Sequence, residues 1–119
     1  MVSLFERIGG DAAVDAAVDR FYAIVLKDDR IAHFFAGVDM VRQTQHQKIF
    51  LKYAFGGLPN YPGRAMRAAH ERLVGLGDTH FDAVLDDLGQ ALRGLNVADG
   101  MIAEVVAIAE TTRADVLNR

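Results

Sequence analysis

Apolar residues recur along most of the chain at intervals of three and four, which is the spacing of one face of an α-helix. The first such stretch follows Gly9 and Gly10, where Asp11 is placed to cap a helix that runs to about Lys27. Alternation of apolar and polar residues at every second position, which would indicate a half-buried strand, is not sustained anywhere. The pattern therefore predicts an all-α protein. The apolar face of the first helix is expected to consist of Val14, Ala17, Val18, Phe21, Tyr22 and Val25.

Three further long helices follow from the same spacing. Asp39 is expected to cap a second helix over about residues 40–54, a third helix starts near Thr79, and a fourth spans about residues 98–117. Residues 31–39 are too few for a long helix and too aromatic for a solvated loop, so they predict a tight irregular corner. The glycines and prolines of "GGLPNYPG" forbid regular structure. The expected apolar faces are Phe81, Val84, Leu85, Leu88 and Leu92 in the third helix and Met101, Ile102, Val105, Ile108 and Ala109 in the fourth.

Length and composition limit what the protein can be. The 119 residues suit one domain, 1–119, and the 51% hydrophobic share is enough to bury a core. The net charge is −3 and the 13 basic residues are scattered, so no nucleic-acid surface is expected. With no cysteine there is no disulfide, thiolate nucleophile or cysteine-based metal site. No apolar run approaches the about 18 residues of a membrane span, and the first residues do not resemble a secretory signal, so we expect a cytoplasmic protein.

One histidine falls on an apolar helix face. The stretch "RAMRAAHERLVGLG", residues 64–77, predicts a short helix in which His70 shares a face with Met66, Leu73 and Val74. A buried imidazole needs partners for both ring nitrogens, so His70 must be hydrogen-bonded or bound to something. "HERLV" begins like the zinc-protease pattern HExxH, but Val74 stands where the second histidine is required. No Glu-x-x-His pair occurs either, which excludes the ligand set of di-iron bundles.

The second helix carries an unusual polar cluster. Gln43, Gln47 and Phe50 share a face, continued by Ala54, and His46 lies at the edge of that face. Amides and an imidazole above a phenylalanine are expensive to bury without a polar partner. Tyr22, on the apolar stripe of the first helix, is a candidate for the same site. The alternative is that the tyrosine hydroxyl reaches water and the glutamines line a rim, and the pattern alone leaves both interpretations open.

Two acidic pairs and two other histidines are expected to have no special role. The members of Asp28-Asp29 and of Asp86-Asp87 are sequence neighbours, so they point in different directions on a helix or turn and are predicted to be solvated charges. His33 lies beside a turn and His80 near a helix start, and neither position favours a functional role.

The chain resembles the group I truncated haemoglobins from end to end. The stretches that carry the resemblance are "LFERIGG", "VDRFYAIVLKDDRIAHFF", "VDMVRQTQHQKIFLKYAFGG", "YPGRAMRAAHERLV", "HFDAV" and the terminal "DVLN", in the order and near the spacing of that family. The resemblance implies a two-over-two helical sandwich around a b-type haem. In this fold the first globin helix is nearly absent and the proximal helix is very short.

The resemblance also implies roles for individual residues. His70 matches the proximal histidine that binds the haem iron, which would explain an imidazole on an apolar face. Tyr22 matches the distal tyrosine, and Gln43 and Gln47 match the two distal polar positions, whose donors stabilise bound dioxygen because the bound gas carries partial negative charge. The other haem contacts that the resemblance implies are Phe34, Phe35, Phe50, Tyr61, Met66 and Leu73, with Arg42 at the propionates and Arg64 and Lys48 as weaker candidates there.

Two features of the family differ among its members. Some relatives with a histidine at the position of His46 use it as a sixth iron ligand when no gas is bound, and others do not, so both states remain open. Some relatives attach the haem covalently through a histidine just before "DVLN". Here the preceding residues are "TTRA", and the absence of a histidine predicts non-covalently bound haem b. The loop between Val74 and Phe81 is also shorter than in several relatives.

The resemblance favours reversible dioxygen binding, for carriage, storage or sensing, with carbon monoxide and nitric oxide as further ligands. One alternative is enzymatic, as a nitric oxide dioxygenase that converts nitric oxide to nitrate or as a peroxidase-like enzyme, with a reductase as partner. Tight oxygen retention by Tyr22 and the glutamines suits nitric oxide oxidation better than transport. A second alternative is electron transfer through a bis-histidine haem, which requires His46 on the iron. We expect a monomer with no membrane or nucleic-acid partner.

Overall fold

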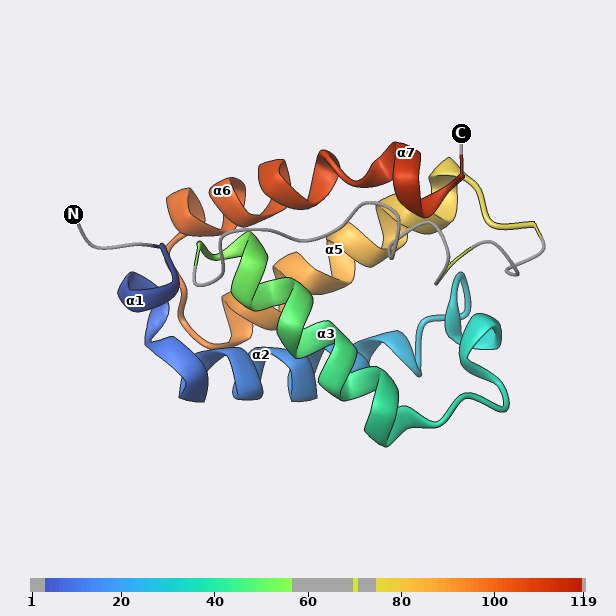
Figure 1. Ribbon diagram of the computed structural model, residues 1–119, viewed down its shortest axis with the longest axis horizontal. Helices are drawn as coiled ribbons and strands as arrows, with labels where there is room; N and C mark the ends of the chain where they lie inside the picture. Colours follow the sequence, from blue (N-terminus) through green and yellow to red (C-terminus); the bar gives the residue numbers. More distant parts are fainter. Residues whose placement is uncertain (1–3, 57–69, 71–74, 119) are drawn as a thin grey trace.

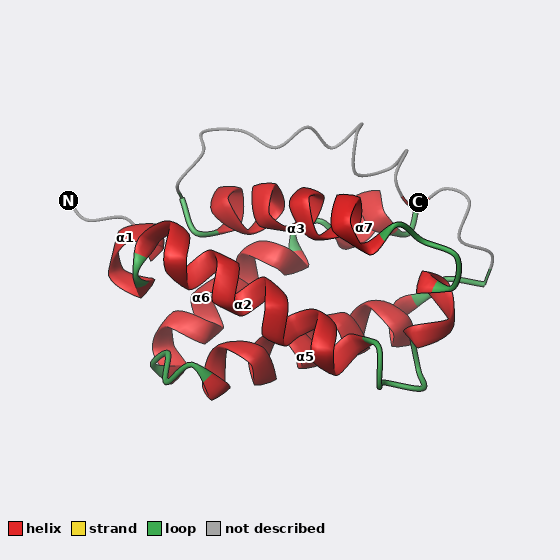
Figure 2. Ribbon diagram, turned by 90° about the horizontal axis from the view of Figure 1, so that it is seen from below, coloured by secondary structure: helices red, strands yellow, loops and turns green. Residues whose placement is uncertain are grey.

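The computed structural model describes residues 4–56, 70 and 75–118. These residues form helices and connecting turns, and no strand occurs among them (Figures 1 and 2), which confirms the all-α prediction for the part of the chain described. None of the described helices is long and apolar enough to cross a membrane. The elements are α1 (Leu4–Ile8), α2 (Gly10–Val25), the 3-10 helix η1 (Ala32–Phe35), α3 (Met40–Ala54), α5 (Asp78–Gly94), α6 (Asp99–Glu110) and α7 (Arg113–Val116).

The four long helices α2, α3, α5 and α6 form the body of the molecule. α2 packs against both α3 and α5, and α5 packs in turn against α6 (Figure 1). The buried face of α2 consists of the six apolar residues that the spacing predicted, so helical periodicity identified the central element of the core. Residues that form the rest of the buried core include Ile31, Phe50, Leu51, Phe55, Ala83, Leu88, Ala91, Leu92, Ile102, Val105 and Ala109.

The start of α2 differs from the expectation. The cap position is Gly9, not Asp11, and Gly9 and Gly10 have φ values of 129° and 70°. Glycine adopts these angles without the steric cost that a Cβ imposes, so the chain can turn directly from the short helix α1 into α2. Asp11 lies in the first turn of α2 and forms an ion pair with Lys52 of α3 (2.8 Å). The predicted cap at Asp39 is confirmed.

Asp39 begins α3 through its side chain, which accepts hydrogen bonds from the backbone N–H groups of Val41 and Arg42. The predicted corner before it contains the single turn η1. At the other end of the chain, the predicted fourth helix is interrupted. The hydroxyls of Thr111 and Thr112 donate to the carbonyls of Ile108 and Ala109 (2.6 Å each), and α7 starts after this break.

Arg113 fixes the short helix α7 against the start of α5. Its guanidinium pairs with Asp78 and Asp82 of α5 and with Glu110 of α6, and it lies 4.6 Å from the centre of the Phe81 ring. α7 is therefore held close to the beginning of α5, where a cavity opens.

Candidate haem-binding cavity

A cavity of about 240 Å³ lies among η1, α3, the first half of α5 and the α6–α7 break. Apolar side chains form most of its wall, which suits a flat apolar ligand. Its described lining consists of Ile31, Phe34, Phe35, Val38, Gln43, His46, Gln47, Phe50, His70, Leu76, His80, Phe81, Val84, Leu85, Leu88, Ala109, Thr112 and Val116.

His70 lines this cavity and is half-buried. Its position among apolar side chains agrees with the helix-face pattern from which it was singled out. Other predicted site residues, Tyr61, Arg64, Met66 and Leu73, lie outside the described residues, as do residues 57–63 of the segment 56–63 that was predicted to be irregular.

The polar face of α3 also lines the cavity. Gln43, Gln47 and Phe50 all contribute, as their spacing predicted, and the two glutamines are half-buried while Phe50 is buried. His46 is solvent-exposed and borders the cavity, at the edge of the face where the sequence placed it. An imidazole from outside α3 and two amides on α3 therefore share one largely apolar space.

Tyr22 connects to the cavity through Gln43. Only 6% of the tyrosine is exposed, which favours a place in the site over the alternative of a solvent-exposed side chain. The Gln43 amide Nε2 donates a hydrogen bond to the tyrosine oxygen (3.1 Å), and the Tyr22 ring packs edge-on against Phe35, which lines the cavity (centroids 5.7 Å apart). Tyr22 itself is not among the described lining residues, so it lies directly behind Gln43 and Phe35.

The ionisation of Tyr22 follows from this environment. Burial raises the pKa of Tyr22 to about 12, although the hydrogen bond from Gln43 acts in the opposite direction. The phenol is consequently protonated at neutral pH. Because its oxygen already accepts from Gln43, its O–H proton is available to another acceptor.

The predicted cations differ in their surroundings. Arg42 is exposed on α3, where its guanidinium is open to solvent. Lys48 is partly buried and forms an ion pair with Asp15 of α2 (3.3 Å). Of the two, Arg42 is the better placed to meet an anionic group at the surface.

His80 is a cavity residue to which sequence reasoning gave no role. Its Nδ1 accepts a hydrogen bond from the backbone N–H of Gly77 (2.9 Å), and its ring lies edge-on to Phe34 (centroids 5.1 Å apart). The histidine thereby caps the start of α5 and forms part of the wall. The signal was its place in the first turn of the helix, three residues after the cap residue Gly77, where a side chain can reach back to the cap. His33 is exposed, as expected of a turn residue.

The prediction that both acidic pairs are solvated is wrong for one member of each. Asp29 and Asp86 are exposed, but Asp87 is only 1% exposed and the Asp28 side chain only 10%. Asp87 lies on the inward face of α5 between Ala83 and Ala91, one turn away on either side and both buried. Residues four positions apart lie on the same face of a helix, so the position of Asp87 between these two alanines was the sequence signal for its burial.

The donor set of the cavity suits haem. Among the residues that the structure describes, no three histidine or acidic side chains are grouped to hold a metal ion directly. A metal held within an organic ring needs fewer protein ligands, and one imidazole is a common axial ligand of haem iron. His70 is an imidazole in the cavity that could take this part, and Phe34, Phe35 and Phe50 are apolar lining residues that a flat macrocycle could contact.

Comparison with known proteins supports the same conclusion. The family model for bacterial-like globins matches residues 3–118. The chain is 54% identical to the group 1 truncated haemoglobin GlbN of Synechocystis sp., with the whole of both chains covered, and 40% identical to that of Tetrahymena thermophila, with 98% of this chain and 96% of the other covered. 

Solved structures of such proteins have the same fold. The 2/2 haemoglobin from Synechococcus sp., in the cyanomet state and with covalently attached haem, superposes with a TM-score of 0.92 at 53% identity, covering 99% of this chain and all of the other. The Fe(III) truncated haemoglobin from Tetrahymena pyriformis gives 0.88 at 40% identity, with 97% of each chain covered. The chain belongs to the bacterial-like globins, with the two-over-two fold of the group 1 truncated haemoglobins, and membership of this family implies haem binding.

Proposed function

We propose that this protein binds haem b non-covalently, that His70 would hold the haem iron, and that the protein binds dioxygen reversibly at that iron. When bound, the haem supplies the iron at which a diatomic gas is coordinated. Phe34, Phe35 and Phe50 provide apolar contacts for the ring, and Arg42 provides a cation for a propionate at the surface.

The hydrogen bond from Gln43 to Tyr22 is the observation that carries this proposal. It lies beside the cavity that His70 lines, and it leaves the Tyr22 O–H proton free to be donated. Gln47 adds a second amide on the same face of α3. A hydrogen bond to an acceptor that carries charge contributes about 1.5–3 kcal/mol, which corresponds to roughly a tenfold to hundredfold slower release. Phenol and amide donors therefore favour a ligand with partial negative charge.

The residues just before "DVLN" support the proposal that the haem is held non-covalently. Thr112 is a described residue just before "DVLN" that lines the cavity, and its hydroxyl donates to the carbonyl of Ala109. None of the four residues of "TTRA" is a histidine, so this segment has no imidazole to which haem could be attached covalently.

The same donors support nitric oxide oxidation as a second candidate function. A protein that releases oxygen slowly delivers little of it, whereas retained dioxygen is available to convert nitric oxide to nitrate. This candidate requires a reductase to restore the ferrous protein after each turnover. Sustained nitrate production in the presence of a reductant would favour it over carriage.

The visible spectrum of the ferrous protein tests reversible binding. The spectrum should change when oxygen is admitted and return to its gas-free form when oxygen is removed under argon. Conversion to the ferric spectrum on the first exposure to oxygen, with no recovery, would contradict the proposal.

Replacement of His46 with leucine is expected to leave the gas-free ferrous spectrum unchanged. His46 is exposed at the border of the cavity and lies about one helical turn from Gln43, so it reaches the interior only if α3 shifts. His33→Leu is a matched control, because His33 is exposed and is not among the described lining residues.

Sharp low-spin bands in the wild type that disappear in His46→Leu, but persist in His33→Leu, would show that His46 binds the iron. That result would support the bis-histidine electron-transfer alternative.

A further inference from the structure

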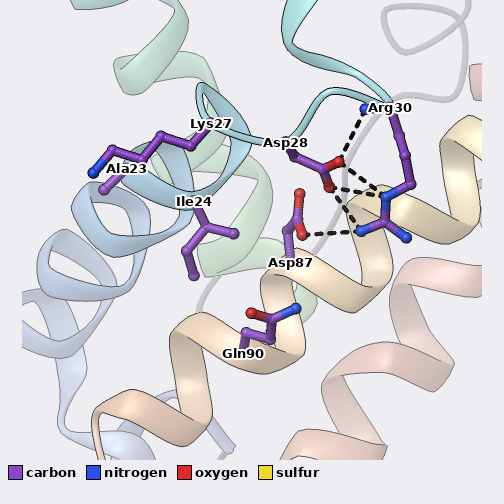
Figure 3. A pocket seen from close by; sticks show the side chains of 7 residues that line it. All are labelled: Ala23, Ile24, Lys27, Asp28, Arg30, Asp87 and Gln90. Carbon is purple, nitrogen blue, oxygen red and sulfur yellow. Dashed lines mark hydrogen bonds and ion pairs between the residues drawn. The ribbon is translucent and has the colours of Figure 1, made fainter.

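Two carboxyl groups meet where the turn after α2 packs on α5. Asp28 lies in that turn and Asp87 on the inward face of α5. Their carboxyl groups lie next to each other, and the Arg30 guanidinium lies beside both of them (Figure 3). The Arg30 Nη2 atom is 2.7 Å from Asp28 Oδ2 and 3.5 Å from Asp87 Oδ1. Both carboxyl groups are largely removed from water, so their charges are not screened as surface charges are.

The single positive charge of Arg30 does not neutralise both carboxylates. Its Nε donates to both oxygens of Asp28, and its Nη2 is also shared with the exposed Asp86 (3.2 Å). Among the residues that the structure describes, Asp87 Oδ2 has no hydrogen-bond partner although it is buried. A buried carboxylate oxygen without a donor is costly, whereas a protonated carboxyl is neutral and becomes a donor itself.

We propose that the carboxyl groups of Asp28 and Asp87 hold one proton between them, and that loss of this proton loosens the packing of the η1 segment on α5. The proton places an O–H on Asp87, which donates toward Asp28. Arg30 then neutralises the one negative charge that remains. Without the proton, two adjacent buried negative charges share a single guanidinium that also pairs with Asp86.

The ionisation of both groups agrees with a shared proton. The pKa of Asp87 is raised to about 7, and burial is the largest cause. The neighbouring Asp28 also raises this pKa, and its effect is larger than the opposite effect of Arg30. Hydrogen bonds from Arg30 hold the pKa of Asp28 well below its usual range. Asp28, Arg30 and Asp87 line a surface pocket between the end of α2 and α5. Lys27 is the other charged residue in the lining of this pocket, and Gln90 of α5 is a polar one.

The junction is connected to the haem cavity on both sides. The Asp28 carbonyl accepts hydrogen bonds from the N–H groups of Ile31 and Ala32, at the start of the segment that carries Phe34 and Phe35 into the cavity. On α5, Leu88 follows Asp87 directly and lines the same cavity. The proton therefore controls how firmly one wall of the cavity is attached to another.

The direction of the pH effect follows from the raised pKa of Asp87. The folded protein retains a proton that the unfolded chain loses above its ordinary pKa of 3.8, so the contribution to stability is complete below that pH and is lost as the pH rises through about 7. Between about pH 5 and pH 8 the unfolding equilibrium constant should rise by roughly a hundredfold from this group.

Urea unfolding of the haem-loaded protein at several pH values tests the proposal with two variants. In Asp87→Asn, an amide can donate to Asp28 but cannot ionise, so the additional pH-dependent loss of stability should disappear. Asp29→Asn is the matched control, since Asp29 is an exposed aspartate next to Asp28 in the sequence, and it should keep the wild-type pH dependence. Haem release is followed separately in all three proteins through the Soret absorbance. Wild-type pH dependence in Asp87→Asn would overturn the proposal.

Two measurements on the haem-loaded carbon monoxide form complete the test. The ¹³Cγ resonance of Asp87 in the wild type should titrate near pH 7, and a midpoint below about pH 5 would exclude a retained proton whether or not the variant folds. Hydrogen exchange of the Ile31 and Ala32 amides should lose protection above neutral pH in the wild type relative to Asp87→Asn. Equal protection in the two proteins at every pH would show that the proton does not control the η1 segment.

Discussion

Replacement of His70 with alanine is expected to abolish stable haem retention, or to leave a site that added imidazole fills. Among the described histidines that line the cavity, His70 is the one that does not come from α3 or from the capping position of α5, and the rest of the cavity wall around it is mainly apolar. Loss of the imidazole removes the proposed bond to the haem iron and leaves only the contacts between the cavity wall and the haem macrocycle. The Soret absorbance that remains with the protein after gel filtration measures retention, and recovery with imidazole shows that the cavity persists.

His33→Ala is the control for this experiment, because it removes an exposed imidazole that is not among the described lining residues. It should retain haem like the wild type. An unchanged Soret spectrum in His70→Ala would refute the assignment of His70 as the axial ligand.

Replacement of Tyr22 with phenylalanine is expected to quicken oxygen dissociation by about tenfold or more. The change removes one hydroxyl and almost no volume, so the packing of the ring against Phe35 and Phe21 should survive. Tyr22 carries its hydroxyl on a rigid ring held within the core, whereas a glutamine must immobilise more torsions to place a donor. Stopped-flow displacement of oxygen by carbon monoxide measures the rate.

Carbon monoxide dissociation provides an internal control for the Tyr22→Phe variant, because a less polar ligand should be affected less. A similar acceleration for both gases would indicate a general disturbance of the pocket. Equal oxygen release by wild type and variant would rule out Tyr22 as the principal donor, and Gln43 and Gln47 would then be the residues to replace.

Helical periodicity was sufficient to predict the face of α3 that lines the cavity. Gln43, Gln47 and Phe50 lie on one face of α3 because that face is set by the geometry of a single helix. The contact between Gln43 and Tyr22 could not be predicted in the same way. It depends on how α2 packs against α3, which the spacing within either helix does not specify.

Asp87 shows where reasoning from residue type fails. An aspartate is usually solvated, and the pairing with Asp86 suggested the same. Its burial depends on the turn that carries Asp28 and Arg30 to α5 from a distant part of the chain. The start of α2 was missed for a local reason, because the positive φ angles of Gly9 and Gly10 allow an abrupt turn that the hydrophobic pattern does not reveal.

A crystal structure of the haem-loaded ferric protein with cyanide as a diatomic ligand tests the central claim most directly. The proposal predicts that an imidazole nitrogen of His70 is bonded to the iron and that the Tyr22 hydroxyl donates to the cyanide on the opposite side, with Gln43 still donating to the tyrosine. Iron held by another side chain, or a cyanide whose outer atom lacks a hydrogen bond from Tyr22, Gln43 and Gln47, would contradict it.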